Sequence, residues 1–244
     1  MAGHNKWSKV KHIKGALDAK RGKIFSKLSR ELTVAAKVGG GDADLNAHLR
    51  MVLLKAKQAN MPADTIDRAI KKGVGGGEGT DFEDLVYEIY APEGVAILVE
   101  ISTDNKNRTA AEIRHILSKN GGSIATSGAV TRLFHRKGQI IISREGTDED
   151  KVMEIALEAG AEDFLAEPEG YEIITDPSEF ETVHKAVENA GISCDSAGVT
   201  CLPDSLVPVS PEGAGKISKI IDLIDEHDDV KEVYSNADFP QESS

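Results

Sequence analysis

The spacing of hydrophobic and polar positions divides the chain into a helical first third and a β-rich remainder. Over residues 17–38 apolar side chains recur every three or four positions until the three glycines 39–41, which predicts an amphipathic helix. The same spacing predicts a second helix over 43–59 and a third over 62–72, where Pro62 suits a first helical position. Three helices joined by short connections predict a small bundle.

A glycine-rich stretch over residues 73–80 separates the two parts. It follows a predicted helix rather than a strand and has no Gly-Lys-Ser/Thr ending, so we interpret it as a linker and not as a phosphate-binding loop. Beyond it, apolar runs of strand length alternate with four stretches of helical spacing. We expect strands over 85–90, 95–101, 129–135, 139–143, 162–166, 171–175, 192–200, 206–209 and 230–234, and helices over 108–119, 148–159, 178–190 and 215–227.

The order of these elements predicts an α+β protein in which a three-helix bundle precedes two ferredoxin-like units. Residues 138–202 give strand, helix, strand, strand, helix, strand, and the segments on either side supply a second such unit, so one unit is inserted into the other. The expected domains are a basic helical domain over 1–78, a discontinuous ferredoxin-like domain over 79–135 plus 204–244, and an inserted ferredoxin-like domain over 136–203.

Charge is distributed as unevenly as secondary structure. Residues 1–72 hold 16 Lys and Arg against 6 Asp and Glu, whereas residues 73–244 hold 13 against 35, so a +10 segment precedes a -22 remainder. A basic cluster is the electrostatic footprint of a nucleic-acid-binding element, and an acidic remainder repels phosphate and would confine nucleic acid to one end. The alternative is a solvated face that only keeps the protein in solution.

The first predicted helix carries part of this charge on one side. Its cations at positions 20, 23, 27 and 30 lie about 130° around the helix from the apolar stripe, so packing and phosphate contact can coexist. The candidate nucleic-acid-binding residues are Lys6, Trp7, Lys9, Lys11, Lys14, Lys20, Arg21, Lys23, Lys27, Arg30, Lys106 and Arg108. Trp7, the only tryptophan, can either stack on a base or cover the open end of the bundle.

Residues 103–110 form a second polar stretch, which joins a predicted strand to a predicted helix. Its Asp and Asn side chains, at 104, 105 and 107, would cap the helix, and a cap alone explains most of the composition. Lys106 and Arg108 nevertheless stand where a helix N-terminus favours an anion, so a contact role remains open.

The sequence offers no convergent set of catalytic groups, and we expect no metal and no cofactor. It lacks the HExxH, GxSxG and Walker patterns, and its seven His residues are scattered. Cys194 and Cys201 lack zinc spacing and are interpreted as buried small apolar side chains. The acidic run over 225–229 lacks the alternating ligands of a calcium loop and predicts the solvated end of a helix.

Neither a membrane span nor a secretory signal is expected. No apolar run approaches the ~20 residues that cross a bilayer, and the first residues, MAGHNKW, contain no apolar stretch. We therefore expect a cytoplasmic protein without membrane contact.

Seven motifs occur in order along nearly the whole chain: MAGHNKW at 1–7, DAKRGKIF at 18–25, ANMP at 59–62, RAIKKG at 68–73, GVAI at 94–97, TDNKNRTA at 103–110 and DDV at 228–230. Together they resemble the YebC family. The resemblance implies three domains around a cleft, no known catalysis and, in most descriptions, DNA binding in transcriptional regulation. Related proteins act in translation instead, among them a mitochondrial translational activator of cytochrome oxidase, and bacterial members are implicated in helping ribosomes through proline-rich stretches.

The charge pattern and the resemblance predict a nucleic-acid-binding protein, with two alternative ligands. We expect a non-enzymatic regulator that binds promoter DNA or, as the alternative, a translation factor that binds ribosomal RNA and the ribosome. A hydrolase or ligand-responsive enzyme that uses the cleft between the α/β units is the weaker hypothesis, because a fold alone does not establish catalysis. The acidic domains could also hold a basic protein partner. Phosphate contacts do not encode sequence, and the third helix offers few candidate readers of bases, so the choice between DNA and RNA stays open.

Overall fold

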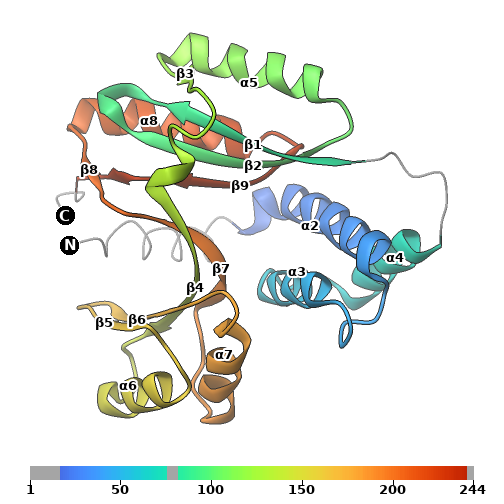
Figure 1. The fold of residues 1–244 in the computed structure, drawn as a ribbon, viewed down its shortest axis with the longest axis vertical. Helices are drawn as coiled ribbons and strands as arrows, with labels where there is room; N and C mark the ends of the chain where they lie inside the picture. The colour runs from blue at the N-terminus through green and yellow to red at the C-terminus, as the bar shows by residue number, and fades with distance from the viewer. Residues whose placement is uncertain (1–16, 76–81, 241–244) are drawn as a thin grey trace. The chain divides into compact units, whose positions relative to one another are not determined.

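The computed structural model describes residues 17–75 and 82–240, with side chains from residue 21 onward (Figure 1). Within these ranges the chain forms two compact units. One comprises residues 135–202, and the other comprises the described residues up to 134 together with those from 203 onward. The fold is α+β, as predicted, with helices first and antiparallel sheets after them. The division into three domains stays a prediction.

Three described helices open the larger unit: α2 (Leu17–Gly39), α3 (Ala47–Gln58) and α4 (Ala63–Val74). Their apolar faces meet in one core because each helix has hydrophobic residues at intervals of three and four. The buried members of this core are Leu28, Leu32, Ala35, Leu49, Val52, Ala56, Met61 and Ala69. The helical spacing in the sequence therefore identified most positions of the inner faces of this small bundle. Leu45, expected on the inner face of the second helix, was wrong, since it lies before α3 and is 84% exposed.

The start of α3 differs from the prediction by four residues. Asn46 is the N-cap, and its side-chain oxygen accepts a hydrogen bond of 3.0 Å from the backbone N–H of Leu49. The Asn46 amide also donates to the carbonyl oxygens of Ala35 and Gly40 at 2.9 and 2.8 Å. One buried side chain thus ends α2 and begins α3, which fixes the turn between them.

Gly73 permits the close approach of α4 to α2. A Cβ atom at this position would lie 2.4 Å from the carbonyl oxygen of Thr33 and 2.8 Å from the Cβ of Ala36. Both are parts of α2 that cannot rotate away, so only glycine fits here without moving a helix.

The rest of the larger unit is a ferredoxin-like sheet with the strand order β3-β1-β2-β9, and α5 and α8 cover one of its faces (Figure 1). Neighbouring strands are antiparallel. The elements are β1 (Glu83–Tyr90), β2 (Ala96–Thr103), α5 (Lys106–Asn120), β3 (Ser123–Ile124), α8 (Pro211–Asp225) and β9 (Val230–Ser235). A parallel pair, β8 (Val207–Pro208) and β10 (Ala237–Asp238), completes the unit. Strand β2 is buried along almost its whole length, as the central position requires.

Of residues 129–135, expected as a strand, only the last two lie in one, since a 3-10 turn over Thr131–Leu133 precedes a strand that begins at Phe134. The buried carboxylate of Glu88 explains the difference, since it accepts hydrogen bonds from the backbone N–H groups of Gly128, Val130 and Thr131 at 2.6 to 2.8 Å. Because these N–H groups donate to Glu88, they cannot form hydrogen bonds with a neighbouring strand. Burial alone would raise the pKa of Glu88, but the three N–H groups outweigh it and lower the pKa below its usual value.

The unit of residues 135–202 also has the ferredoxin-like order of elements that the sequence predicted. Its strands are arranged as β5-β6-β4-β7. Along the chain the elements are β4 (Phe134–Ser143), α6 (Glu149–Glu158), β5 (Asp163–Ala166), β6 (Gly170–Thr175), α7 (Phe180–Asn189) and β7 (Ser196–Pro203). Its core contains buried side chains from strands and helices alike, among them Ile140, Ile142, Val152 and Phe180.

Replacing Gly73 by alanine tests the close packing of α4 on α2. Gly73→Ala should lower the free energy of unfolding by about 1–3 kcal/mol, because the added methyl group must push a helix aside. Gly22→Ala is the matched control, since a Cβ at Gly22 in α2 meets nothing within 4 Å. That control should be neutral or stabilising by up to about 1 kcal/mol. Urea denaturation measures both, and equal effects of the two substitutions would contradict the assignment.

Candidate nucleic-acid interface

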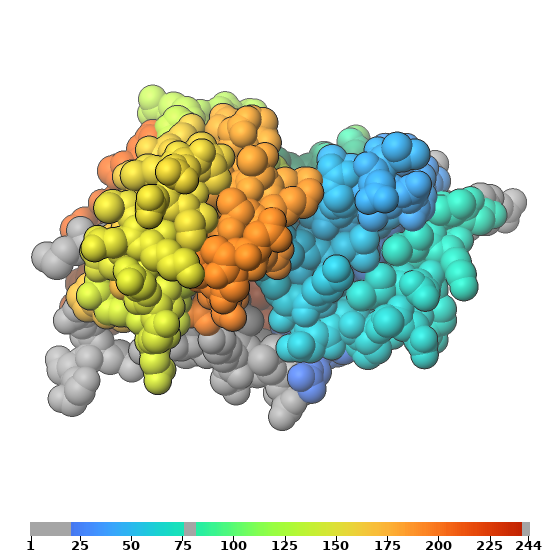
Figure 2. All heavy atoms as spheres, turned by 90° about the horizontal axis from the view of Figure 1, so that it is seen from below, coloured from blue at the N-terminus to red at the C-terminus, as the bar shows by residue number. Residues whose placement is uncertain are grey.

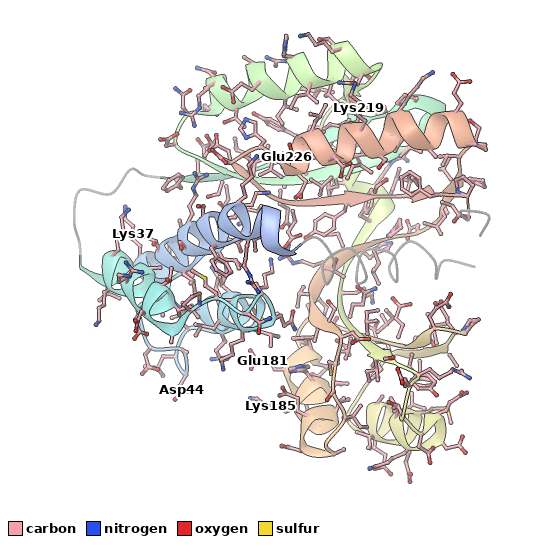
Figure 3. All side chains as sticks on the ribbon, turned by 180° about the vertical axis from the view of Figure 1, so that it is seen from behind. Lys37, Asp44, Glu181, Lys185, Lys219 and Glu226 are labelled. Carbon is pink, nitrogen blue, oxygen red and sulfur yellow. The ribbon has the colours of Figure 1, made fainter. Side chains whose placement is uncertain are left out.

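The basic side of α2 lies against the C-terminal end of α8. Lys23 Nζ donates to the carbonyl oxygen of Glu226 at 3.3 Å, and Lys27 Nζ donates to the carbonyl oxygen of Asp225 and lies 3.3 Å from its carboxylate. Figure 3 labels Glu226 at this end of α8, next to α2. The last carbonyl groups of a helix carry a partial negative charge, so cations here are favourable.

Arg30, one turn further along α2, reaches deeper. Its guanidinium donates to the carbonyl oxygens of Ser102 and Asp228 at 3.3 and 2.9 Å and to the Asp229 carboxylate at 3.0 Å. It also lies over the ring of Phe82, 5.0 Å from the ring centre. These contacts join α2 to the end of β2 and to the start of β9.

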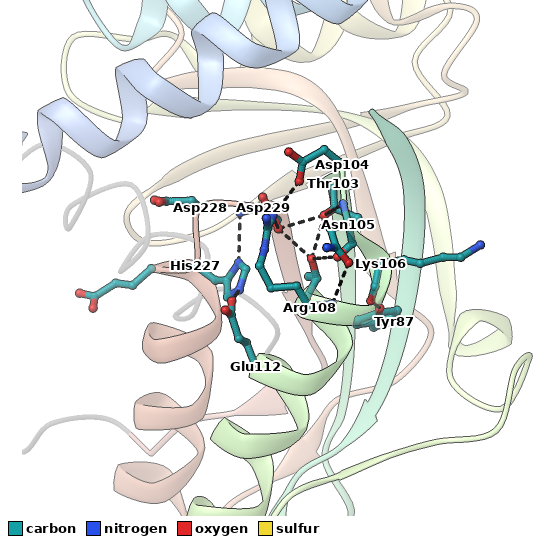
Figure 4. A network of polar contacts seen from close by, with 12 residues as sticks. Tyr87, Thr103, Asp104, Asn105, Lys106, Arg108, Glu112, His227, Asp228 and Asp229 are labelled. Atoms are coloured by element: carbon teal, nitrogen blue, oxygen red, sulfur yellow. Dashed lines mark hydrogen bonds and ion pairs between the residues drawn. The ribbon is translucent and has the colours of Figure 1, made fainter. Parts of the chain in front are cut away.

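Asp229 is the centre of this network (Figure 4). Its Oδ1 accepts from Arg30, while its Oδ2 accepts from the hydroxyls of Thr103 and Thr109 at 3.0 and 2.7 Å and from Arg108 at 2.9 Å. The residue is only 4% exposed. A buried carboxylate is tolerated because two guanidinium groups and two hydroxyls satisfy it.

The same contacts determine the pKa of Asp229. Burial alone would raise it, but the hydrogen bonds from Arg108, Thr109 and Thr103 and the charge of Arg108 outweigh burial and lower the pKa to about 2. The carboxylate therefore stays ionised at neutral pH. Its role is structural, because every oxygen already has protein partners.

His227 holds the backbone of the same loop. The backbone N–H of Asp229 donates to His227 Nδ1 at 3.1 Å, and His227 Nε2 lies 2.6 Å from Glu112 Oε2 (Figure 4). Because Nδ1 accepts, Nε2 carries the proton and donates to the carboxylate. This hydrogen bond connects the loop to α5.

Residues 103–110 were interpreted either as a helix cap or as a contact with an anion, and the structure shows the cap. Asn105 is the N-cap of α5 and accepts from the backbone N–H of Arg108 at 3.1 Å. Arg108 pairs with Asp104 at 2.8 Å as well as with Asp229. Lys106 points outward, with its side chain 63% exposed and its Nζ 3.7 Å from a carboxylate oxygen of Glu83. Within this loop, Lys106 is therefore better placed for an external anion than Arg108.

The acidic run over 225–229 was expected to be the solvated end of a helix, and for Asp229 this prediction was wrong. The prediction fits Asp225, whose side chain is 53% exposed, but Asp229 is buried at the head of β9. The available signal was its position directly before a buried strand within the DDV motif. Nothing in the local sequence indicates that its partners come from α2 and α5.

The predicted nucleic-acid-binding residues thus fall into three groups. Lys6, Trp7, Lys9, Lys11 and Lys14 lie outside the described residues, and Lys20 lies on α2 in a turn whose side chains are not described. Lys23, Lys27, Arg30 and Arg108 make the internal contacts above, whereas Arg21 and Lys106 are exposed. The structure brings the second group together, around the end of α8. Their binding of nucleic acid stays a prediction.

Further exposed cations lie on α3 and α4, whose outer surface is cyan in Figure 2. Lys57, Lys71 and Lys72 are exposed and make no ion pair with any other described residue. The outer face of α4 is mixed in charge, since Asp64 and Asp67 precede Arg68 and Lys71.

Lys55 differs from these cations because it is a structural group. Its Nζ lies 2.9 Å from Glu232 Oε1 on β9 and 3.7 Å from Glu31 Oε2 on α2. Burial would lower the pKa of Lys55, but the two carboxylates outweigh it and raise the pKa above its usual value. Burial raises the pKa of Glu31, and Lys55 opposes that rise. Lys55 is thus already neutralised inside the unit.

Within residues 17–75 and 82–240 no group of three or more His, Cys, Asp or Glu side chains could hold a metal ion. Cys194 and Cys201 form no disulfide and are half-buried, where the sequence analysis expected buried side chains. Burial raises the pKa of the Cys194 thiol to about 12, so it stays protonated. None of the helices that the structure describes is long and apolar enough to cross a membrane.

Comparisons with known proteins cover nearly the whole chain. The model of the TACO1/YebC N-terminal domain matches residues 5–76, and the model of the TACO1/YebC second and third domain matches residues 82–237. Probable transcriptional regulatory proteins of Desulforapulum autotrophicum and Halothermothrix orenii are 54% and 52% identical over 242 and 245 residues. Each alignment covers 99% of this chain, with 98% and 97% of the relative. The crystal structure of a conserved hypothetical protein from Aquifex aeolicus matches with a TM-score of 0.82 and 44% identity, over 93% of each chain.

Asp229→Asn tests the buried network. The substitution leaves Arg30 and Arg108 without their shared charge, so the free energy of unfolding at pH 7 should fall by about 3 kcal/mol. Asp228→Asn is the matched control, because Arg30 contacts the carbonyl oxygen of Asp228, which the substitution keeps. It should change stability by less than about 0.5 kcal/mol.

The pH dependence separates the carboxylate from general packing. Since the pKa of Asp229 is about 2 in the folded protein and near 3.8 when unfolded, its ionisation contributes about 2 kcal/mol of stability above pH 5, which is lost as the pH falls toward 2. The stability difference between the wild type and Asp229→Asn should therefore narrow by about 1 kcal/mol between pH 7 and pH 3. A constant difference in urea denaturation over this range would show that the charge is not responsible.

Proposed function

This chain belongs to the TACO1/YebC family, and we propose that it is a non-enzymatic regulator of gene expression that binds nucleic acid through its basic N-terminal domain. The family's relatives are named as probable transcriptional regulatory proteins, and regulation of transcription favours DNA as the ligand. A cytoplasmic location is part of this proposal. Within the described ranges no group of three or more His, Cys, Asp or Glu side chains could hold a metal ion, which is compatible with a binding protein.

The observation that carries the proposal is the charge separation along the chain. The formal net charge of residues 1–72 is +10, and that of residues 73–244 is -22. Electrostatic attraction to phosphate is non-specific and strong, while the acidic remainder repels it, so nucleic acid is directed to the N-terminal domain. Lys57, Lys71 and Lys72 extend the available positive charge from the N-terminal segment and α2 onto α3 and α4.

Salt dependence tests this proposal. If about six phosphates of duplex DNA are neutralised, the slope of log K against log salt should be near -5. Replacing Lys9, Lys11 and Lys14 together by alanine should flatten the slope by about 3, because each lysine releases about one counterion. These three residues are chosen because Lys27 and Arg30 also stabilise the fold.

The control replaces Lys119, Lys151 and Lys219 by alanine, which removes the same charge from exposed positions outside the N-terminal domain. Its slope should stay within about 0.5 of the wild type. Fluorescence anisotropy with a labelled 20-base-pair duplex measures all three proteins. Equal slopes for the wild type and the first variant would reject the proposed surface.

One observation favours structured RNA as the ligand instead. A recognition helix places its N-terminal residues in the major groove, but the first turns of α4 carry Asp64 and Asp67, which phosphates and base acceptors would repel. A surface that reads phosphates and shape suits folded RNA, including the RNA of a ribosome. Transcription and translation therefore both remain candidates for the regulated step.

Crosslinking in growing cells, followed by sequencing of attached DNA and RNA, separates the two. A transcriptional regulator should yield reads concentrated at a few promoters, whereas a ribosome-bound factor should yield reads concentrated in one region of ribosomal RNA. Either signal should drop about tenfold in the Lys9, Lys11 and Lys14 alanine variant if phosphate contacts dominate the affinity. Diffuse reads that this variant does not change would count against both.

A further inference from the structure

The end of α8 concentrates negative charge where a helix disfavours it. Asp225 is the last helical residue, Glu226 is the C-cap, Asp228 follows, and the last turn has no basic residue of its own. Carboxylates at a helix C-terminus are repelled by the partial negative charge of the last carbonyl groups. This segment, residues 225–228, is called the acidic end of α8 below.

Cations from α2 compensate this charge. Lys23 and Lys27 contact the carbonyl oxygens of Glu226 and Asp225, and Lys27 also contacts the Asp225 carboxylate. A nucleic-acid backbone offers lysine the same chemistry, namely a row of negatively charged oxygens. The acidic end of α8 therefore occupies two lysines that a phosphate backbone would bind.

These contacts differ in depth from the contact of Arg30 with Asp229. The difference lies in the acidic partners, because the Lys27 side chain is only 15% exposed and that of Arg30 is 28% exposed. The Asp225 side chain is 53% exposed, whereas the side chain of Asp229 is 5% exposed and has further partners on α5 and β2. An exposed ion pair changes an equilibrium by less than about fivefold, and salt weakens it. The lysine contacts can therefore open while Arg30 stays fixed to Asp229.

We propose that the acidic end of α8 is an internal competitor for the nucleic-acid surface, and that a phosphate backbone displaces it from Lys23 and Lys27. This inference rests on the proposed function. The Arg30 and Asp229 contact keeps α2 attached while the exchange takes place. Ligands that present several closely spaced phosphates are favoured over isolated anions, because they replace both lysine contacts at once.

A single neutralising substitution tests the competition. Asp225→Asn removes the carboxylate that contacts Lys27, so the protein should bind a 20-base-pair duplex or an RNA hairpin about threefold more tightly in about 50 mM salt. Asp222→Asn is the matched control, because Asp222 is an exposed acid of the same helix, one turn earlier, with no α2 contact among the described residues. It removes the same charge and should change the affinity by less than about 1.5-fold.

Hydrogen exchange on the wild-type protein provides an independent readout. The amides of Glu226 and His227 donate to the carbonyl oxygens of Asp222 and Ile224 at 2.9 and 3.0 Å. When the acidic end of α8 is displaced, its last turn loses the cations that stabilise it, so these amides should exchange faster with nucleic acid bound. Simple shielding by a ligand would slow them instead.

The outcomes separate this inference from the proposed function. The competition is supported if Asp225→Asn binds nucleic acid more tightly than the wild type while Asp222→Asn does not, and if the wild-type amides of 226–227 exchange faster on binding. If the wild type binds nucleic acid, Asp225→Asn binds it with the same affinity, and the amides of 226–227 exchange at the same rate or more slowly on binding, the competition is overturned. The proposed function then still stands. If neither the wild type nor Asp225→Asn binds DNA or RNA in low salt, both fail.

Discussion

The buried carboxylate of Asp229 is the interaction on which the larger unit depends. It joins Arg30 of α2, Thr103 at the end of β2 and Thr109 and Arg108 of α5 to the first residue before β9. A carboxylate in this position is stable only when all of its partners are present, because an unpaired charge in a buried site costs several kcal/mol. Helix, strand and loop are therefore positioned by one group, and α2 cannot be placed independently of the sheet.

This constraint divides the basic residues into two kinds. Arg30, Arg108 and Lys55 neutralise buried carboxylates, so their charge is used within the unit. Cations on the exposed surface, such as Lys57 and Lys106, keep theirs for solvent or a ligand. Sequence position does not distinguish the two kinds, since Lys55 and Lys57 stand two residues apart on α3. The difference lies in whether an acidic side chain from a distant segment faces them.

The same distinction explains how much the sequence could predict. Local periodicity predicted α2, most helices and strands of the two ferredoxin-like units and the Asn105 cap, because each of these elements depends on residues close together in the chain. The role of Glu88, which accepts hydrogen bonds from the amides of Gly128, Val130 and Thr131, could not be predicted from spacing, and a strand was expected there instead. The partner of Arg30 is likewise 199 residues away. Long-range polar networks leave little local signal, since each of their residues is ordinary in its own segment.

The separation of charge along the chain also has a structural consequence. A basic domain and an acidic domain joined in one molecule attract each other, so some of the cations that attract nucleic acid are also attracted to the protein's own carboxylates. Burial decides which attraction prevails at each residue. At Arg30 the partner carboxylate of Asp229 is buried and has further partners of its own, whereas at Lys23 the partner is a carbonyl group at an exposed helix end. One face of α2 can thus stabilise the fold at one end and meet a ligand at the other.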